Sequence, residues 1–373
     1  MSEPLRLVFC GLSLSSSWGN GHATTYRGLL KELRLRGHSI VFLERDVSWY
    51  RDNRDLPASD FCELSLYQNL EELESSYSET VRAADVVVVG SYTPDGIAVG
   101  HWVQRTALGL KVFYDIDTPV TLAQLNAGSC TYLSPELIPD YDLYLSFTGG
   151  PTLEHIERQL GSPCARVLYC SVDPSKYFPQ THSTLWELGY LGTYSVDRQP
   201  RLDALLIQTA MQRPESRFAV AGAQYPPDIE WPPNVERIDH IPPEKHRQFY
   251  NSQRFTLNVT RTDMVIAGYS PSVRLFEAAA CGVPIISDFW HGLDSIFRTG
   301  SEIFVAATAS DTLQTLAQPP EVSLRVAERA RDRVLREHTS SHRALEFETY
   351  VRSLLDSSRG QRSDGCQRLQ VYS

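Results

Sequence analysis

Short apolar runs alternate with loops and amphipathic segments through the first half of the chain. Residues 5–10 form an apolar run typical of a buried strand, and a Gly/Ser-rich loop follows over residues 11–22. Leucines then recur at helical spacing over residues 29–33, and Gly37 ends this predicted helix before the next strand at 39–43. Strand, loop, helix and strand in this order predict a βαβ unit and therefore a parallel sheet.

The alternation continues to mid-chain and then starts again. In the first half, further apolar runs predict strands at residues 85–89, 111–114, 142–147 and 167–169. A stretch rich in Pro, Ser, Thr and His then runs to about residue 185 and suits a linker. The second series comprises predicted strands at 187–192, 217–221, 235–239, 255–259 and 283–287, with helices at 202–211 and 273–281. Two successive series predict two Rossmann-like domains.

Two helical stretches follow near the C-terminus. The first spans residues 322–337, and the second begins at Thr339 or Ser340 as N-cap and has an apolar face that needs a surface to cover. Residues from 358 onward are polar and rich in Gly and Ser, which predicts disorder. We therefore predict domains at 1–175 and 186–338, a separate helix at 339–357 and a disordered tail at 358–373.

Composition and charge narrow the class of protein. Hydrophobic residues make up 42% and charged residues 21% of the 373 positions, as in ordinary globular proteins, and the length suits two domains. The net charge of −10 argues against a nucleic-acid partner. No run approaches the roughly 18 apolar residues of a membrane-spanning helix, and we expect no signal peptide, because Ser2, Glu3 and Pro4 lead directly into a predicted strand. The seven cysteines contain no CxxC pair, so we expect reduced thiols, no metal site and a cytoplasmic protein.

The segment at residues 268–288 carries the strongest chemical signal. A Gly/Ser/Pro loop enters a helix there, and the unpaired backbone N–H groups at such a helix start suit a diphosphate. Arg274 lies in the first turn, where a cation opposes the helix dipole, so an anion nearby would explain its position. Glu277 could accept both hydroxyls of a ribose. The alternative interpretation is a solvated surface pair of Arg274 and Glu277.

The run at residues 276–287, Phe-Glu-Ala-Ala-Ala-Cys-Gly-Val-Pro-Ile-Ile-Ser, resembles the donor-site signature of retaining-type GT-B glycosyltransferases. Its amino-acid sequence is most similar to that of the CgeB-like, or spore-maturation-like, branch, and the resemblance extends over residues 188–198, 258–261 and 288–294. The first half is similar to the family more loosely, through residues 115–122 and 169–173. The resemblance implies an α/β fold of GT-B type: two Rossmann-like domains facing a central cleft, with the C-terminal helix crossing back to the first domain.

The resemblance also implies the reaction and its donor site. We expect a hexosyltransferase-type enzyme that transfers a sugar from a UDP-, GDP- or dTDP-linked donor to an acceptor hydroxyl, with retention and without a metal or other cofactor. Glu277 would bind the ribose and main-chain atoms of Ile241 the base. Tyr269 occupies the position where many relatives carry a second glutamate near the transferred sugar. The predicted donor-binding set is Gly192, Thr193, Tyr194, Ser195, Arg198, Ile241, Arg261, Tyr269, Ser270, Ser272, Arg274 and Glu277.

Candidates for the acceptor side and for acid–base chemistry lie in the first domain. Gly19, Asn20 and Gly21 let the backbone approach a ligand, and His22 begins a helix, which favours the neutral imidazole of a general base. His22 could equally be an N-cap that bonds its own helix. Asp115 and Asp117 follow a strand, and alternation would place both carboxylates on one face. Of the two we favour Asp117 as the catalytic candidate, the alternative being an Asx turn.

Three other functions deserve comparison. The string from Gly19 to Thr24 begins like a dinucleotide fingerprint with Glu44 at the expected distance, but its third glycine is missing and its loop is too long. A sugar-nucleotide epimerase of GT-B shape stays open because of Tyr269. A non-catalytic sugar-nucleotide-binding protein would use the same donor contacts.

Overall fold

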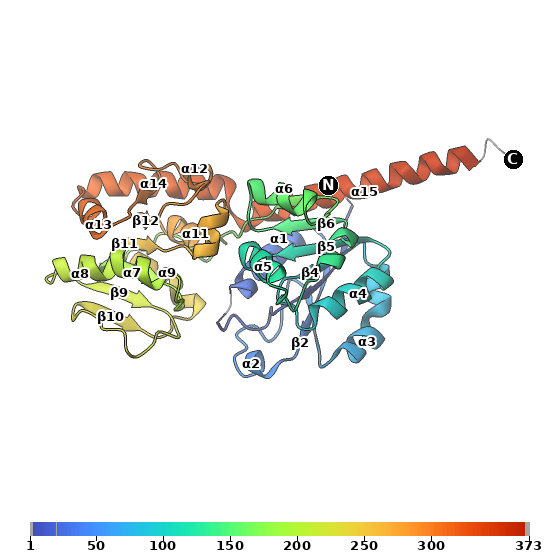
Figure 1. Ribbon diagram of the computed structural model, residues 1–373, viewed down its shortest axis with the longest axis horizontal. Coiled ribbons are helices and arrows are strands. Elements are labelled where there is room, and N and C mark those ends of the chain that lie inside the picture. Colours follow the sequence, from blue (N-terminus) through green and yellow to red (C-terminus); the bar gives the residue numbers. More distant parts are fainter. Residues whose placement is uncertain (1–2, 20, 370–373) are drawn as a thin grey trace. The chain divides into compact units, whose positions relative to one another are not determined.

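The computed structural model describes residues 3–19 and 21–369, with side chains as far as Ser357, and divides into two compact units (Figure 1). Unit 1 comprises Met1–Tyr169 and Ser341–Ser373, and unit 2 comprises Cys170–Ser340. The division falls earlier than the predicted linker because residues 170–172 bond within unit 2: the Cys170 thiol donates to Pro271 O at 3.2 Å, and Val172 pairs with Thr339.

Unit 1 contains a parallel sheet with seven strands among the described residues, in the order β3-β2-β1-β4-β5-β6-β7. The strands are β1 (Arg6–Gly11), β2 (Ser39–Arg45), β3 (Glu63–Tyr67), β4 (Val86–Gly90), β5 (Leu110–Asp115), β6 (Leu143–Ser146) and β7 (Ala165–Val167). The predicted strand at 167–169 is therefore wrong by two positions, because only residues 165–167 find partners on β6. The β-branched run of β4 is buried on both faces, as expected for a central parallel strand.

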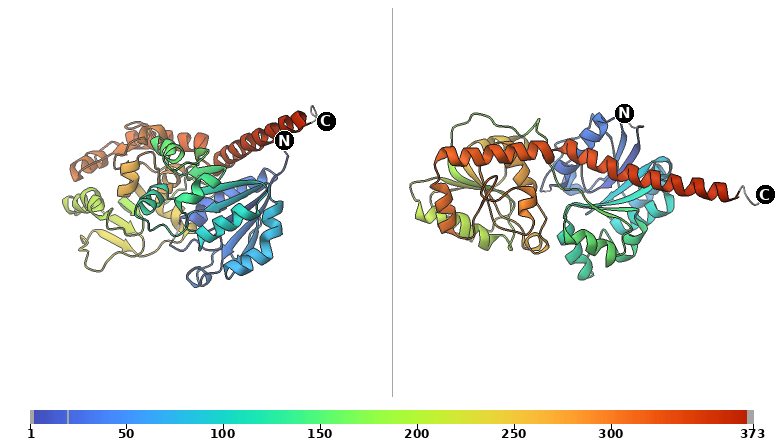
Figure 2. Two further views of the ribbon diagram at one scale, coloured as in Figure 1. Left: turned by 45° about the vertical axis from the view of Figure 1, so that its right-hand side comes forward. Right: turned by 90° about the horizontal axis from the view of Figure 1, so that it is seen from above.

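Helices cover both faces of this sheet (Figures 1 and 2). One hydrophobic core contains Phe9, Phe42 and Val88 with Leu30 of α1 (His22–Leu35) and Phe347 of α15 (Ser340–Leu369). The other contains strand residues of opposite parity. It packs against α3 (Leu70–Ala83), α4 (Gly96–Thr106), η1 (Pro135–Asp140) and α6 (Pro151–Arg158). The remaining helices of unit 1 are the short α2 (Ser48–Arg51) and α5 (Thr118–Asn126).

Unit 2 contains a second parallel sheet, in the order β10-β9-β8-β11-β12-β13. Its strands are β8 (Trp186–Leu191), β9 (Phe218–Ala221), β10 (Val235–Ile238), β11 (Gln253–Asn258), β12 (Ile285–Ser287) and β13 (Phe304–Val305). After β10 its helices are α9 (Pro243–Asn251), α10 (Thr262–Ala267), α11 (Val273–Ala280), α12 (Leu293–Ile296), α13 (Ala309–Leu316) and α14 (Pro320–Glu337). Three alanines keep α11 narrow, and it is buried from Arg274 to its end at Ala280, in contact with the sheet and with α14.

Two predicted segments differ from the structure. The expected helix at 202–211 begins earlier and is interrupted, because α7 (Gln199–Leu202) and α8 (Gln208–Gln212) flank a π-helical turn, η2 (Asp203–Ile207). The predicted disordered tail from residue 358 is helical as far as Leu369, and residues 370–373 lie outside the described part. Once a helix is nucleated each added residue gains a backbone hydrogen bond, and no proline interrupts this stretch.

The two parallel Rossmann-like sheets confirm the predicted α/β fold class. Among the described residues, no helix is both long enough and apolar enough to cross a membrane.

Candidate functional site

The strand order of unit 2 creates a natural binding position between β8 and β11. From β8 the chain continues to β9 and β10 on one side, whereas β11, β12 and β13 follow on the other. The loops after β8 and β11 therefore diverge at the carboxyl edge of the sheet. In open α/β sheets, ligands bind in the crevice at this switch point.

Arg274 lies at this switch point and is buried, with only 8% of its surface exposed. Its Nε donates to Leu191 O at the end of β8, and its Nη1 donates to Asn258 Oδ1 at the end of β11, 2.8 Å away. The guanidinium also lies 4.9 Å from the ring centroid of Tyr190. Neutral acceptors hold the cation, and a side chain at position 192 would clash with its Nη2, so Gly192 leaves that nitrogen accessible.

Two further arginines join Arg274 in a cation cluster. Burial, and after it the charges of Arg274 and Arg261, lower the pKa of Arg198, so the three guanidinium groups repel one another. Arg198 donates from Nη2 to Thr193 O, while its buried Nε has no hydrogen-bond partner in the structure. Among the described residues, no carboxylate lies within 4.0 Å of any of these three guanidinium groups. A partly buried positive cluster that makes no ion pair with a described carboxylate is suited to an anionic ligand.

The loop at residues 192–198 offers backbone donors beside the cluster. The Gly192 N–H donates to Ala221 O at 2.8 Å and the Tyr194 N–H to Ala223 O at 2.9 Å. The N–H groups of Thr193, Ser195 and Val196 donate to no acceptor in the described part of the chain. The Ser195 hydroxyl bonds the Asp197 carboxylate, which also accepts the Thr262 N–H at 2.8 Å and so connects the loop to α10. Arg261 is the N-cap residue of α10.

Glu277 is buried on α11, three residues after Arg274. The Tyr250 hydroxyl of α9 donates to its Oε2 at 3.0 Å. Burial, and next the charge of Glu277, raise the pKa of Tyr250 and of Tyr177 well above the usual value of a tyrosine, so both hydroxyls stay protonated and able to donate. The alternative interpretation, a solvated surface pair, is therefore wrong, because Arg274 and Glu277 are both buried and each bonds other groups.

The loop before α11 has an unusual backbone. Gly268 has φ of +66° and Tyr269 of +48°, so two successive residues have a positive φ. The Tyr269 ring lies against Gly292, where a side chain would approach it to 2.4 Å, and its N–H donates to His291 O at 2.6 Å. Ser270 bonds Gly268 O at 3.0 Å through its hydroxyl. Left-handed non-glycine residues are costly and cluster at ligand sites.

A polar network that the sequence analysis left out of the site supports this loop and Arg274. Asn258 Oδ1 accepts from Ser272 Oγ at 2.9 Å as well as from Arg274, and its Nδ2 donates to Ser287 Oγ at 2.9 Å. Asp288 accepts the N–H and the hydroxyl of Thr260, and burial raises its pKa. Asn258 lies in a string that the resemblance covers. No local pattern reveals that it would meet Arg274, 16 residues further along the chain.

Ile241, the predicted base-binding residue, follows the loop after β10. Its carbonyl is 3.0 Å from His246 Nε2, and His246 Nδ1 is 3.5 Å from the Tyr177 hydroxyl. Tyr177 interacts in turn with Glu277, so the side chains of His246 and Tyr177 connect Ile241 to Glu277. The structure thus groups most of the predicted donor residues, from Gly192 to Glu277, around the carboxyl edge of one sheet.

In unit 1 the loop between β1 and α1 hydrogen-bonds the carboxylate of Glu44. This buried carboxylate accepts the N–H groups of Leu14 and Ser15, at 2.6 and 2.8 Å, and the hydroxyls of Ser13 and Ser15. A dinucleotide-binding domain would need this carboxylate for a ribose. Because the loop itself takes both oxygens, the oxidoreductase interpretation has no structural support.

His22 and Asp117, the two predicted catalytic residues, lie close together in unit 1. His22 is the first residue of α1 and Asp117 the N-cap of α5, and Nε2 and Oδ2 are 3.8 Å apart. The His22 ring contacts Tyr92 edge-on, and its buried Nδ1 has no hydrogen-bond partner in the structure. An N-cap role for His22 is wrong, because Gly21 is the N-cap.

The expected pairing of Asp115 with Asp117 on one strand face is wrong. The strand β5 ends at Asp115, so alternation does not reach Asp117. Asp115 is fully buried, where it accepts from Tyr144 at 2.6 Å, from Thr121 at 2.7 Å and from the Asp117 N–H. Burial raises the pKa of Asp115 to about 6. It therefore forms the Asx-type bond that the sequence analysis considered as the alternative.

The predicted acceptor-side glycines precede His22. Gly19 has φ of +68° with open space around its Cα, and Gly21 O accepts from the N–H and hydroxyl of Thr25 at 3.2 Å. Asn20 lies outside the described residues.

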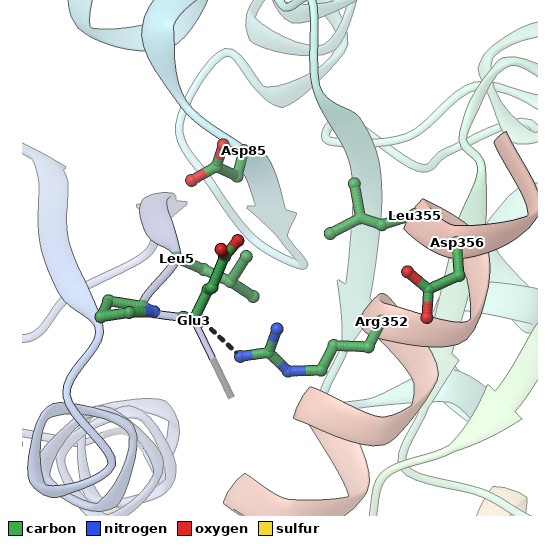
Figure 3. Close-up of a pocket in the computed structure, with 7 residues that line it drawn as sticks. Glu3, Leu5, Asp85, Arg352, Leu355 and Asp356 are labelled. Atoms are coloured by element: carbon green, nitrogen blue, oxygen red, sulfur yellow. Dashed lines mark hydrogen bonds between the residues drawn. The ribbon is translucent and has the colours of Figure 1, made fainter. Parts of the chain in front are cut away.

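A hollow at the opposite, amino edge of the unit 1 sheet carries charge but is remote from these loops (Figure 3). It is lined by Glu3, Asp85 and Asp356, with Arg352 donating to Glu3 O at 2.6 Å. Arg6 pairs with Asp85 at 3.4 Å. Two of the charged residues that line it, Asp85 and Arg352, already bond protein groups, and the carboxyl edges of the sheets remain the candidate site.

The chain resembles known proteins in part of its sequence and in its fold. A family model described as "Glycosyl transferase-like" matches residues 198–349, which include Arg198, Arg261, Arg274 and Glu277. No curated protein matches the sequence. The chain is similar in structure to sucrose-phosphate synthase from Thermosynechococcus elongatus, at 14% identity and a TM-score of 0.69 over 95% of this chain and 100% of that one.

Two other similar structures hold ligands. HepE from Anabaena in complex with UDP has a TM-score of 0.70 at 13% identity, over 94% of this chain and 100% of that one. An alpha-glucosyltransferase in complex with UDP-glucose and DNA containing an abasic site has a TM-score of 0.70 at 12% identity, with the same coverage. At these identities the comparisons establish a shared fold.

Proposed function

We propose that this chain is a glycosyltransferase that moves a sugar from a nucleotide-sugar donor to an acceptor hydroxyl. The observation that carries this proposal is the cluster of Arg198, Arg261 and Arg274, buried or half-buried at the switch point, with no described carboxylate within 4.0 Å of their guanidinium groups. Unpaired cations in such a place cost stability unless a ligand supplies the negative charge. A diphosphate does so.

The same cluster suits catalysis of the transfer. The bond from the sugar C1 to the β-phosphate oxygen breaks, a bond from C1 to the acceptor oxygen forms, and negative charge develops on the leaving diphosphate. Three guanidinium groups, with the free N–H groups of Thr193, Ser195 and Val196, would stabilise that charge. We propose on this basis that the reaction requires no metal ion.

Glu277 is proposed to bind the ribose. Tyr250 holds one of its oxygens, which fixes the carboxylate while leaving acceptor capacity for ribose hydroxyls. Ile241 would contact the base through its main chain. UDP is the first nucleotide to test, because HepE and the alpha-glucosyltransferase bind it, and GDP and dTDP follow.

In unit 1, the His22–Asp117 pair is proposed to take the proton of the acceptor hydroxyl, with Gly19, Asn20 and Gly21 on the acceptor side. Asp117 would orient the imidazole and balance its charge after proton transfer. Retention of configuration, a hexosyl donor and membership of the CgeB-like branch rest on the resemblance of residues 276–287. The net charge of −10 argues against DNA as acceptor, which leaves glycans, small molecules and proteins.

The test is a calorimetric titration of the wild type and of Glu277→Ala with UDP, GDP, dTDP, ADP and NAD. We expect one nucleoside diphosphate to bind the wild type, and Glu277→Ala to weaken it by about 1–3 kcal/mol. The matched control is Glu215→Ala, which removes an exposed carboxylate of unit 2 and should bind the nucleotide as the wild type does. Equal affinity in Glu277→Ala and wild type would contradict the ribose assignment.

Transfer itself is tested by incubating the UDP-sugar with an acceptor panel, with and without EDTA. UDP release that depends on acceptor and persists in EDTA supports the proposal. An epimerised donor without UDP release would instead identify the chain as an epimerase. Donor binding with neither reaction would identify it as a non-catalytic sugar-nucleotide-binding protein.

A further inference from the structure

The loop after β9 packs backbone to backbone against the loop after β8. Gly222 has φ of +147°, and a Cβ added there would lie 2.0 Å from Gly192 O. The N–H groups of Gly192 and Tyr194 donate to Ala221 O and Ala223 O across the same contact. The conformation of the 192–198 loop therefore depends on the residues that follow β9.

Tyr225, in this second loop, reaches the first loop through its hydroxyl, which donates to Gly192 O at 3.2 Å. Its ring is held from several directions. The Arg237 guanidinium lies 4.1 Å from the ring centroid, and the rings of Tyr194 and Trp231 contact it edge-on at 5.5 and 5.4 Å. A ring packed in this way presents its hydroxyl in one direction.

Arg237 is in turn fixed by the end of β9. It donates to Val220 O and, from Nη2, to Gly222 O at 3.0 Å, so its guanidinium cannot rotate away from the ring. Its Nη2 is 3.8 Å from Asp239, whose side chain is fully exposed. The cation thus serves the loop contact more than an ion pair.

The consequence for the 192–198 loop follows from peptide geometry. A trans peptide is planar, with its C=O and N–H pointing in opposite directions. Tyr225 holds the carbonyl of Gly192, so the Thr193 N–H of the same peptide points away from Tyr225. Arg198 holds the next carbonyl, that of Thr193. Both peptides around Thr193 are therefore fixed, and the Thr193 N–H donates to no described acceptor.

We propose that Tyr225, clamped by Arg237, is a positioning residue for the donor diphosphate: by holding the Gly192 carbonyl it aims the Thr193 N–H at the phosphate oxygens. This inference rests on the proposed function, since it needs a diphosphate beside the arginine cluster. It assigns a role to the hydroxyl of Tyr225, and packing of the aromatic ring alone would not need that atom.

The test compares UDP with uridine in the variant Tyr225→Phe, which keeps the ring and removes the hydroxyl. We expect the affinity for UDP to fall about three- to tenfold, the range for one lost hydrogen bond, and the affinity for uridine to stay unchanged. If the wild type prefers GDP, GDP and guanosine replace the pair. Arg237→Met should change the same ratio in the same direction.

Tyr67→Phe is the matched control, because it removes a buried hydroxyl in unit 1 that bonds nothing in the structure and should leave the ratio unchanged. If the wild type binds no nucleotide, the proposed function itself fails. If the wild type binds UDP and Tyr225→Phe binds it equally well, the function stands and this inference is overturned. Equal losses for UDP and uridine, or a lower melting temperature alone, would show a purely structural role and also overturn it.

Discussion

Arg198, a half-buried cation, carries a direct test of the proposed diphosphate site. Its Nε is buried without a partner, and its pKa is lowered by burial and by Arg274 and Arg261. In the free protein these charges repel one another, and a diphosphate would reverse the sign of that interaction. Stability without ligand and affinity for ligand are therefore opposed at this residue.

We expect Arg198→Met to leave the melting temperature of the free protein unchanged or raise it, while weakening UDP about 10- to 100-fold. Calorimetry with and without UDP measures both effects. Arg254→Met is the contrasting variant: Arg254 pairs with Glu187 at 2.6 Å, so its loss should lower the melting temperature and spare UDP binding. A large loss of stability in Arg198→Met would mean that the cation is structural.

Asp115 has a pH dependence of its own. Burial raises its pKa from 3.8 to about 6, so between these values the folded state keeps a proton that the unfolded state has lost. Its contribution to the free energy of unfolding therefore falls as pH rises from about 4 to 6, and the cost is complete above pH 6. Urea titrations at pH 4, 5, 6 and 7 should show this decline, and Asp115→Asn should flatten it. An unchanged slope in the variant would contradict the assignment.

At the scale of elements, α15 and α1 complete one face of the unit 1 sheet. Phe347 of α15 is 1% exposed and its ring centroid lies 6.0 Å from that of Phe9 in β1. Glu348 accepts from Arg36 at 2.6 Å and from Arg352 at 2.9 Å, which attaches the helix to the end of α1. The C-terminal segment therefore belongs to the core of the unit where the chain begins.

Phe347→Ala should lower the free energy of unfolding by about 3–5 kcal/mol, because it leaves a cavity in this core. Leu345, two residues earlier, is 49% exposed, so Leu345→Ala should change stability by less than about 0.5 kcal/mol. Urea denaturation measures the difference. Similar values for the two variants would mean that α15 does not pack on unit 1 in solution.

At the scale of the whole molecule, the chain carries two independent sheets, and the candidate donor residues all come from one of them. A nucleotide that binds unit 2 should therefore stabilise the two units unequally. We expect hydrogen exchange with saturating UDP to slow in peptides covering residues 192–198 and 268–277. Peptides from the central strands β1 and β4 of unit 1 should be unaffected. Protection confined to unit 1 would mean that the nucleotide binds unit 1, and it would contradict the proposed donor site in unit 2.

The sequence by itself determined the class of the fold and one segment of the site. Strand and helix periodicities are local, so two βα series could be recognised without any contact between distant residues. The loop and helix at 268–280 were recognised for the same reason, because Arg274 and Glu277 lie three residues apart in one motif. The sequence analysis did not predict β3 and β13, which are edge strands of the first and the second sheet. A polar run or a run of two residues gives little periodic signal.

The tertiary structure alone decided which groups surround those residues. Asn258 meets Arg274, Tyr250 meets Glu277, and Tyr225 meets Gly192 because the strand order brings the carboxyl ends of separate strands to one edge. The same applies to Glu44, taken by its own loop, and to Asp115, buried where the strand ends. Strand order and burial arise from packing between elements far apart in the chain, and no local pattern of hydrophobic and polar positions encodes them.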